Sequence, residues 1–339
     1  MYRVGMDGIL ASLAGSGNVP VVIGYHRVVE DFASCAKTCI PSLLTSKQMF
    51  ERHLDWIGRS YQFVDLNEFG KGLESKSGWR HRIAALTFDD GYQDFYDHAF
   101  PVLQKKGIPA AVFVVTDHVG TARVQLHDKL YLLLIRRRGR PLRKPCDGLD
   151  VSHITTMPPY QALRMLVETL PMADLHRVVE ALESEDSLPE DILKSFRSLS
   201  WETLDRIQRS GFTIGSHTRT HVLMANESPA RVQDETAGSR QEMERRLGTT
   251  IRHFAYPSGS FNTASVNAVA AAGYQVGFTS CSHRSAEHPL LTVPRTLLWE
   301  NSSVNSRGFF SGAVLHCQIH HAFDWADTCR QRHTVSQEN

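Results

Sequence analysis

The feature that most constrains the fold is a repeated order of apolar strand, amphipathic helix and glycine. The apolar run 83–88 is followed by helical spacing over 95–106, by Gly107 and by a second apolar run over 109–115. A near-continuous apolar run is typical of a strand buried on both faces, as in a parallel sheet, and a glycine commonly ends a helix. This order therefore predicts a βαβ unit.

The same alternation surrounds this unit on both sides. Strands are expected over 19–26, 61–66, 212–216, 251–256, 274–279 and 291–294, and helices over 45–58, 67–73, 201–210, 230–247 and 265–272. Thr45 or Ser46 is a suitable N-cap for the helix 45–58. Repeated βα units predict an α/β fold, either a parallel barrel or a doubly wound sheet.

Residues 121–199 interrupt this rhythm with helical stretches over 128–137, 159–170 and 173–182 and with polar, proline-containing joins. We interpret them as a helical insertion into a single domain that covers residues 1–339. Because the insertion stands between two strands of the sheet, we expect it to cover the functional site. A C-terminal helical extension is expected over 306–339, with its helix reaching about Trp325.

Composition excludes some classes of protein. The formal net charge of +1 gives no electrostatic case for a nucleic-acid binder. No apolar run is long enough to span a membrane, so no stable membrane insertion is expected. The N-terminal segment has a short apolar stretch interrupted by Asp7, which argues against a signal peptide. The six cysteines contain no C-x-x-C pair and fit a reducing compartment. We therefore expect a cytoplasmic protein.

Two adjacent carboxylates, Asp89 and Asp90, follow the buried strand 83–88 directly, and Gly91 comes next. Like charges this close repel, and each is costly to desolvate. A cation, a metal or solvent exposure should compensate them. A simple alternative is a turn in which one aspartate caps the helix that begins near Gln93.

Two histidines, His217 and His221, stand four residues apart directly after the strand 212–216. If the chain is helical or turns back there, both imidazoles face the same way. This spacing alone is weak support for a metal pair, because packing and surface roles are more common. One aspartate from the other strand end would complete a facial triad that suits Zn, or Fe, Co or Ni. The second aspartate would remain free as a base.

The segments Thr87-Phe88-Asp89-Asp90-Gly91-Tyr92 and His217-Thr218-Arg219-Thr220-His221, taken together, resemble the NodB-type polysaccharide deacetylases of carbohydrate esterase family 4. The resemblance extends from about residue 19 to residue 295 without the insertion. It implies a distorted (β/α)7 barrel. It also implies that Asp89 is the general base and that Asp90, His217 and His221 hold the metal, most simply zinc.

The chain departs from the family pattern in its third motif, Phe254-Ala255-Tyr256-Pro257-Ser258-Gly259. Ala255 stands where the family has an arginine that steadies the base, and Ser258 replaces a tyrosine. Arg295, at a probable strand end, is the candidate substitute for that arginine. We expect Tyr256, Pro257 and Arg295 to border the substrate groove, with an oxyanion donor near Tyr256.

The general acid of the family is a histidine at a strand end. His26, at the end of the first strand, fits this position and resembles the circularly permuted exopolysaccharide deacetylase branch. His316 is the alternative, and a packing role for His26 also stays open.

The resemblance implies hydrolysis of an N-acetyl group on an amino sugar in a polysaccharide, an oligosaccharide or a lipid-linked glycan. Two alternatives stay open. One keeps the site but acts as a deformylase or cyclic-amide hydrolase. The other is a catalytically dead carbohydrate-binding protein, which Ala255 and Ser258 favour and which the intact Asp89, Asp90 and histidine pair oppose.

Overall fold

The computed structural model describes residues 19–75, 79–142, 146, 148–149, 151 and 153–322. The N-terminal segment up to residue 18 and the predicted helix end near Trp325 lie outside the described residues. Within the described part of the chain, every helix is too short or too polar to cross a membrane.

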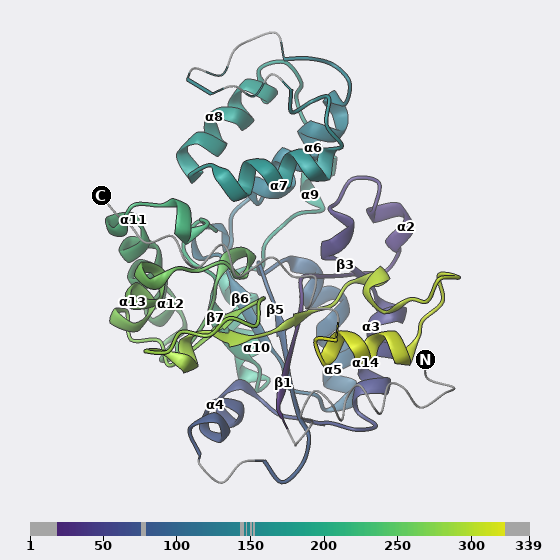
Figure 1. Cartoon of the computed structure of the whole chain (residues 1–339), viewed down its shortest axis with the longest axis vertical. Helices are drawn as coiled ribbons and strands as arrows, with labels where there is room; N and C mark the ends of the chain where they lie inside the picture. The colour runs from purple at the N-terminus through teal and green to yellow at the C-terminus, as the bar shows by residue number, and fades with distance from the viewer. Residues whose placement is uncertain are drawn as a thin grey trace.

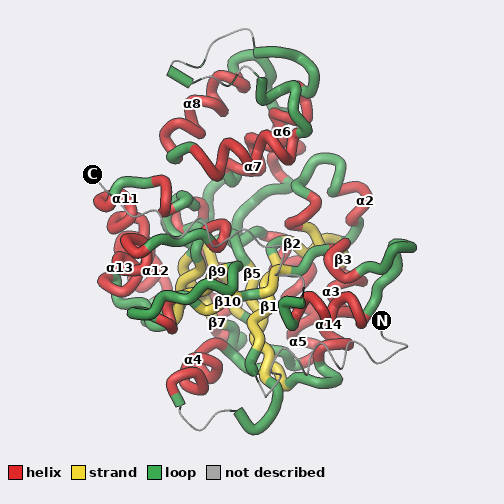
Figure 2. The backbone as a smooth tube through the Cα atoms, viewed as in Figure 1, coloured by secondary structure: helices red, strands yellow, loops and turns green. Residues whose placement is uncertain are grey.

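A ring of parallel strands forms the centre of the molecule, and helices surround it (Figure 2). The strands follow one another in the order β10-β9-β8-β7-β6-β5-β1-β11. Their bounds are β1 Val21–Tyr25, β5 Ile83–Phe88, β6 Ala111–Val114, β7 Thr213–Ser216, β8 His253–Ala255, β9 Val276–Thr279, β10 Val293–Pro294 and β11 Thr296–Leu297. All neighbouring pairs in this order are parallel.

One extended segment nearly closes the ring. This segment consists of β10 and β11, which are separated by Arg295 alone. The first half pairs with β9 and the second half pairs with β1. Counting this segment once leaves seven strand positions, which confirms the predicted distorted (β/α)7 barrel. The last strand continues past the predicted end at Pro294 because its second half finds a partner in β1.

Three short strands lie off this ring. β4 (Gln62–Phe63) pairs with the first residues of β5. β2 (Arg27–Val29) and β3 (Leu44–Ser46) form a separate two-stranded sheet.

The helices that surround the barrel are α2 Phe32–Cys35, α3 Lys47–Ile57, α4 Leu66–Glu74, α5 Phe100–Lys106, α10 Trp201–Arg209, α11 Pro229–Gln233, α12 Ser239–Leu247, α13 Thr263–Ala271 and α14 Gly312–Ile319. The predicted N-cap of α3 is Ser46, whose hydroxyl accepts a hydrogen bond from the backbone N–H of Met49. Helix α14 ends at Ile319, short of the predicted end, because the chain turns there and His321 takes a left-handed φ of 56°.

Side chains of β5 alternate between the two faces of the barrel wall. Ile83 and Ala85 join an inner cluster that also contains Phe113 and Phe278. Leu86 and the other residues of even number on β5 pack outward against the helices. Because side-chain direction alternates with a period of two residues, Asp89 at the end of β5 continues the inward series. Helix α4 belongs to the inner cluster and lies at the lower end of the barrel in Figure 1.

The described part of residues 121–199, where the sequence predicts an insertion between β6 and β7, contains four helices. They are α6 Leu126–Arg137, α7 Pro159–Thr169, α8 Met172–Glu183 and α9 Glu190–Lys194. Helices α6, α7 and α8 lie together above the barrel in Figure 1. They share an apolar cluster of their own, which includes Leu130, Leu163 and Val178.

Arg27 connects this insertion to the barrel. Its buried guanidinium donates to the Asp94 carboxylate and to the Ser195 carbonyl oxygen, each at 2.6 Å. It also lies over the rings of Tyr92 and Phe196, with 4.8 and 4.9 Å to the ring centroids. A buried charge is tolerated only when it is paired and hydrogen-bonded, and here one partner comes from the barrel and another from the end of the insertion.

Candidate metal centre

The carboxyl ends of β5 and β7 bring three metal-binding side chains together. Asp90 follows β5, and His217 and His221 follow β7. Within the described residues, one ligand atom from each of the three lies within 4.8 Å of the others. The Nε2 atoms of His217 and His221 are 3.5 and 3.2 Å from Oδ1 of Asp90. The facial arrangement expected from the sequence is therefore present.

The chemistry of these donors fits a divalent cation. Oδ1 of Asp90 is buried and accepts no hydrogen bond, although a buried carboxylate oxygen normally finds a partner. The Nδ1 atom of His217 lies 2.8 Å from the Ala255 carbonyl oxygen, so Nδ1–H donates there and the lone pair of Nε2 is left to bind a metal. Burial lowers the pKa of His217 to about 4, which keeps this imidazole neutral at pH 7.

The turn after β5 needs unusual backbone angles. Asp90 and Gly91 both take left-handed φ values, 70° and 68°. A Cβ at Gly91 would also lie 2.9 Å from Cγ1 of Val114. Aspartate tolerates this region better than most residues, and glycine does so freely. The alternative interpretation, in which one of these two aspartates caps the following helix, is wrong, because Asp89 bonds to Arg295 and Oδ1 of Asp90 accepts no hydrogen bond.

Asp89 forms a two-point ion pair with Arg295, at 2.7 Å for each of its oxygens. Burial alone would raise the pKa of the Asp89 carboxyl, but the Arg295 guanidinium outweighs burial and holds that pKa below its ordinary value. Arg295 also donates to the Thr87 hydroxyl at 3.1 Å. Asp89 therefore has a fixed orientation and is ionised at neutral pH.

The barrel explains why Arg295 can serve where Ala255 cannot. Ala255 belongs to the inner cluster, and so does Val293, two residues before Arg295. The side chains of Ala255 and Arg295 therefore both point into the barrel, at the carboxyl end of its strands. The small side chain at 255 leaves this interior to a guanidinium from another strand.

His26 follows β1, which pairs with β5 so that Tyr25 stands opposite Phe88. The Asp89 N–H donates to the Tyr25 carbonyl oxygen at 2.9 Å, so His26 and Asp89 are neighbours at the barrel mouth. His26 is partly exposed and lines the same cavity as the triad. His316 instead lies on α14 between Trp56 and His320, outside the lining of that cavity.

Two of the predicted groove residues are placed elsewhere. The prediction for Tyr256 is wrong, because its side chain is fully buried between the rings of Phe254 and Phe261 and its N–H donates to the Phe278 carbonyl oxygen. Because the backbone N–H of Tyr256 is used in that hydrogen bond, it is not available to bind an oxyanion. Arg295 does not border the groove either, because it lies behind Asp89 and is 2% exposed.

Pro257 does line a small recess of about 20 Å³ beside His221 and His127.

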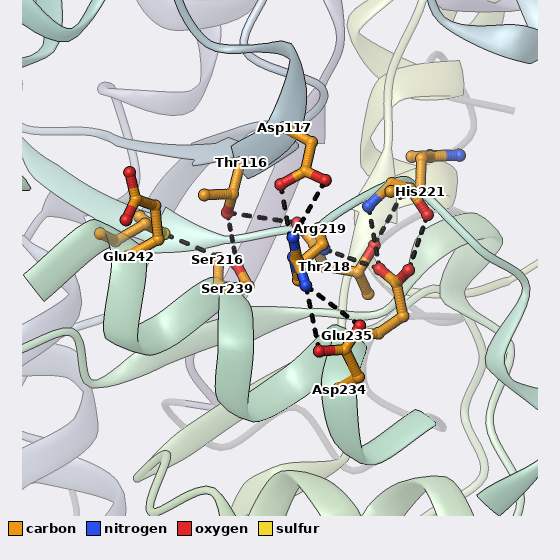
Figure 3. Close-up of polar contacts among 12 residues, drawn as sticks. Thr116, Asp117, Ser216, Thr218, Arg219, His221, Asp234, Glu235, Ser239 and Glu242 are labelled. Carbon is orange, nitrogen blue, oxygen red and sulfur yellow. Dashed lines mark hydrogen bonds and ion pairs between the residues drawn. The ribbon is translucent and has the colours of Figure 1, made fainter. Parts of the chain in front are cut away.

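A loop with strained backbone carries the two histidines. Thr218 and His221 have left-handed φ values of 66° and 62°, which are costly for such residues and need support from their surroundings. Glu235 supplies this support from η6, a π-helical turn over Asp234–Gly238 (Figure 3). Its carboxylate accepts hydrogen bonds from the N–H of Arg219 and Thr220, at 2.8 and 2.9 Å.

We expect the Glu235→Gln variant to bind zinc about 10–100-fold more weakly, as is typical when a group that orients metal ligands is changed. The amide oxygen could still accept from the two N–H groups, but the NH2 group would then face the Arg231 guanidinium, which now lies 2.7 Å from the other carboxylate oxygen. The loop would also lose its charged anchor. Zinc affinity can be measured by competition with a chromophoric chelator, with circular dichroism as the check on folding. Glu242→Gln is the matched control, because Glu242 pairs with Arg245 and Arg246 on the surface of α12, away from the histidine loop. Equal zinc affinity in a folded Glu235→Gln protein would contradict this role.

Three site residues escaped the sequence analysis. His127, at the start of α6, lines the cavity, and its Nε2 is 3.9 Å from Oδ2 of Asp90. The Tyr92 hydroxyl lies 3.0 Å from the same nitrogen and donates to Asp128 at 2.5 Å. Burial lowers the pKa of His127 to about 3. The only signal was a histidine beside an aspartate at the start of a predicted helix, which is too common to single out.

Residues 78–277 match the family model described as polysaccharide deacetylase. Because this match covers more than half of the chain, the protein belongs to the polysaccharide deacetylase family. The metal-binding residues Asp90, His217 and His221 all lie within the matched region.

Two curated relatives extend the comparison. The Bacillus subtilis protein YxkH is 22% identical over 240 residues, which cover 70% of this chain and 60% of YxkH. The poly-β-1,6-N-acetyl-D-glucosamine N-deacetylase of Staphylococcus epidermidis is 35% identical over 112 residues, which cover 31% of this chain and 38% of that protein. The chain therefore spans less than two thirds of the length of either relative.

Solved structures show the same fold. The Streptococcus pyogenes deacetylase PplD, in complex with acetate, superimposes with a TM-score of 0.57 at 18% identity, covering 88% of this chain and 97% of PplD. IcaB from Ammonifex degensii gives a TM-score of 0.54 at 21% identity, covering 90% of this chain and 98% of IcaB. At this level of identity the likeness concerns the fold alone.

Proposed function

We propose that this protein is a metal-dependent hydrolase that removes an N-acetyl group from an amino sugar of a glycan. The observation that carries the proposal is the convergence of the Asp90, His217 and His221 ligand atoms in a cavity that His26 also lines, with the ionised Asp89 next to Asp90 in the chain. The family membership and the exopolysaccharide deacetylases among the relatives support the same chemistry.

Asp90, His217 and His221 would hold the metal, and zinc is the simplest choice for two imidazoles and a carboxylate. When bound, such a metal lowers the pKa of a water and polarises an acyl carbonyl. Cobalt, nickel or iron would suit the same donors.

The other side chains divide the proton transfers. Asp89 accepts a proton from the attacking water as the oxygen bonds to the acyl carbon. His26 donates a proton to the nitrogen as the carbon–nitrogen bond breaks. The products are acetate and a free amino sugar. Arg295 keeps Asp89 ionised before the attack, so that its carboxylate can accept the proton of the water.

The direct test is acetate release from N-acetylglucosamine, its β-1,6-linked oligomers and its glycosides by the zinc-loaded protein. Release of acetate that stops after chelation supports the proposal. Formate release from N-formyl sugars with no acetate release would favour the deformylase alternative. If the wild-type protein with a full complement of zinc hydrolyses none of these substrates, the proposal is contradicted.

The His26→Ala variant should retain its zinc and show kcat lowered by about 10²–10⁴-fold, since that is the usual contribution of a positioned proton donor. His316→Ala is the matched control, because His316 lies on α14 outside the cavity lining. Steady-state kinetics with metal analysis of both variants provide the measurement. A wild-type kcat in His26→Ala would remove His26 from the reaction.

A further inference from the structure

The cavity at the metal-binding residues has a mixed lining. Its volume is about 880 Å³, which falls in the range of small-molecule sites. Asp90, His217, His221 and His26 line it, as do polar residues that include Ser42, Tyr160 and Asn262. Six further lining residues are aliphatic, namely Ile40, Leu43, Leu163, Val167, Leu223 and Leu297. We call these six residues the aliphatic wall.

Two separate parts of the chain build most of this wall. Ile40 and Leu43 come from the segment before β3, and Leu163 and Val167 come from α7 of the insertion. All four belong to the apolar cluster of the insertion or pack against it. Their positions are therefore fixed by a core.

Several polar groups of the lining have partners within the protein. Arg164 and Glu168 form an ion pair with each other at 2.8 Å. The Asn226 side-chain amide donates to the carbonyl oxygens of Glu168 and Leu170, each at 3.2 Å, at the end of α7. Sugar hydroxyls placed against the six aliphatic side chains would lose water without gaining equivalent partners from them, which is unfavourable. An aliphatic chain would lose nothing there and would gain from burial.

We propose that the aliphatic wall is a subsite for a hydrocarbon chain carried by the substrate. The preferred substrate is then an amphiphilic N-acylated amino sugar, with its amide at the metal-binding residues and its chain beneath α7. This inference rests on the proposed function and names the substrate class for the same cavity. The hydrocarbon chain of the substrate has two possible points of attachment, the anomeric oxygen and the amide carbonyl. The aliphatic wall would bind a hydrocarbon chain attached at either point by the same chemistry.

The test uses the full-length, zinc-loaded protein and three sets of substrates. The first set is methyl, butyl and octyl β-glycosides of N-acetylglucosamine. The second is methyl glucosaminide with N-acetyl, N-butyryl and N-octanoyl groups. The third is the β-1,6-linked N-acetylglucosamine oligomer without a chain. All are assayed below their micelle concentrations.

We expect kcat/KM to rise along one of the first two sets by about two- to fourfold for each methylene that the wall covers, and the set that responds identifies the attachment point. Flat kcat/KM values along both sets, with the oligomer hydrolysed as well as the octyl substrate, would overturn the inference but leave the proposed function standing. No carboxylate release from any substrate would overturn the proposed function itself.

A substitution in the wall gives a second, independent readout. Val167→Thr keeps the side-chain shape and adds one hydroxyl to the wall. It should raise KM for the favoured octyl or octanoyl substrate several-fold and change KM for the methyl N-acetyl substrate much less. Leu43→Thr, from the other part of the wall, should act in the same way and covers the case in which Val167→Thr fails to fold.

The control is Val124→Thr, because Val124 is also partly buried and packs against an apolar cluster, yet lies outside the cavity lining. It should leave both substrates unchanged. Equal losses on the long-chain and short-chain substrates in both wall variants would contradict a chain-binding role.

Discussion

The Asp90→Ala variant is expected to contain no bound zinc and to lose hydrolysis by at least about 10³-fold. Asp90 supplies the only carboxylate of the described ligand cluster, and its Oδ1 has no other partner. Without it, two neutral imidazoles remain, and they offset none of the charge of a divalent cation. Metal content by atomic emission and acetate release are the two measurements.

Asp89→Asn separates the ligand role from the base role in the same experiment. Asp89 lies next in the chain but turns its oxygens to Arg295. Asp89→Asn should keep its zinc and still lose hydrolysis, by about 10²–10⁴-fold for a removed base. Full zinc content in Asp90→Ala would overturn the ligand assignment, whereas zinc loss in Asp89→Asn alone would exchange the roles of the two aspartates.

The free energy of unfolding of the Arg295→Met variant should be about 3–5 kcal/mol lower than that of the wild type, because the substitution leaves the buried Asp89 carboxylate without its countercharge. Arg295 and Asp89 are 2% and 3% exposed, so solvent screens this pair little. Urea denaturation of the metal-free protein at pH 7 gives the free energy of unfolding.

A double variant provides the control for this loss. Asp89→Asn with Arg295→Met removes both charges and should recover part of the lost stability, since no unpaired charge remains.

The pH dependence of the stability follows from the depressed pKa of Asp89. The pair stabilises the folded protein above the ordinary aspartate pKa of 3.8, and this contribution is lost as the pH falls through the lower folded-state value. Equal stability of Arg295→Met and wild type at pH 7 would show that the pair contributes nothing.

The local patterns of the sequence predicted the barrel well. The strand 83–88 is found with the predicted bounds, and the three predicted helices of the insertion lie within two residues of their predicted starts, whereas α9 was not predicted. These elements depend on apolar periodicity and on glycine stops, which are local properties. The order of strands around the barrel follows the order in the chain from β5 to β10, because consecutive strands usually lie side by side.

The site was harder to predict where it depends on distant segments. His127 reaches the cavity only because the insertion lies above the barrel, which no local pattern encodes. Glu235 acts through a π-helical turn that ordinary helical spacing does not reveal. Tyr256 was misplaced because a one-residue shift in strand alternation exchanges a cavity-facing side chain for a buried one.

The contact between Arg27 and the end of the insertion limits how such a barrel can be altered. Segments added to a scaffold can often be trimmed or exchanged between homologues. Here, cutting out residues 121–199 would take the Ser195 carbonyl and the Phe196 ring from a buried guanidinium that the barrel retains. A chimera that receives a different cover over its active site would therefore need a matching change at position 27, so the two regions are expected to evolve as a linked pair.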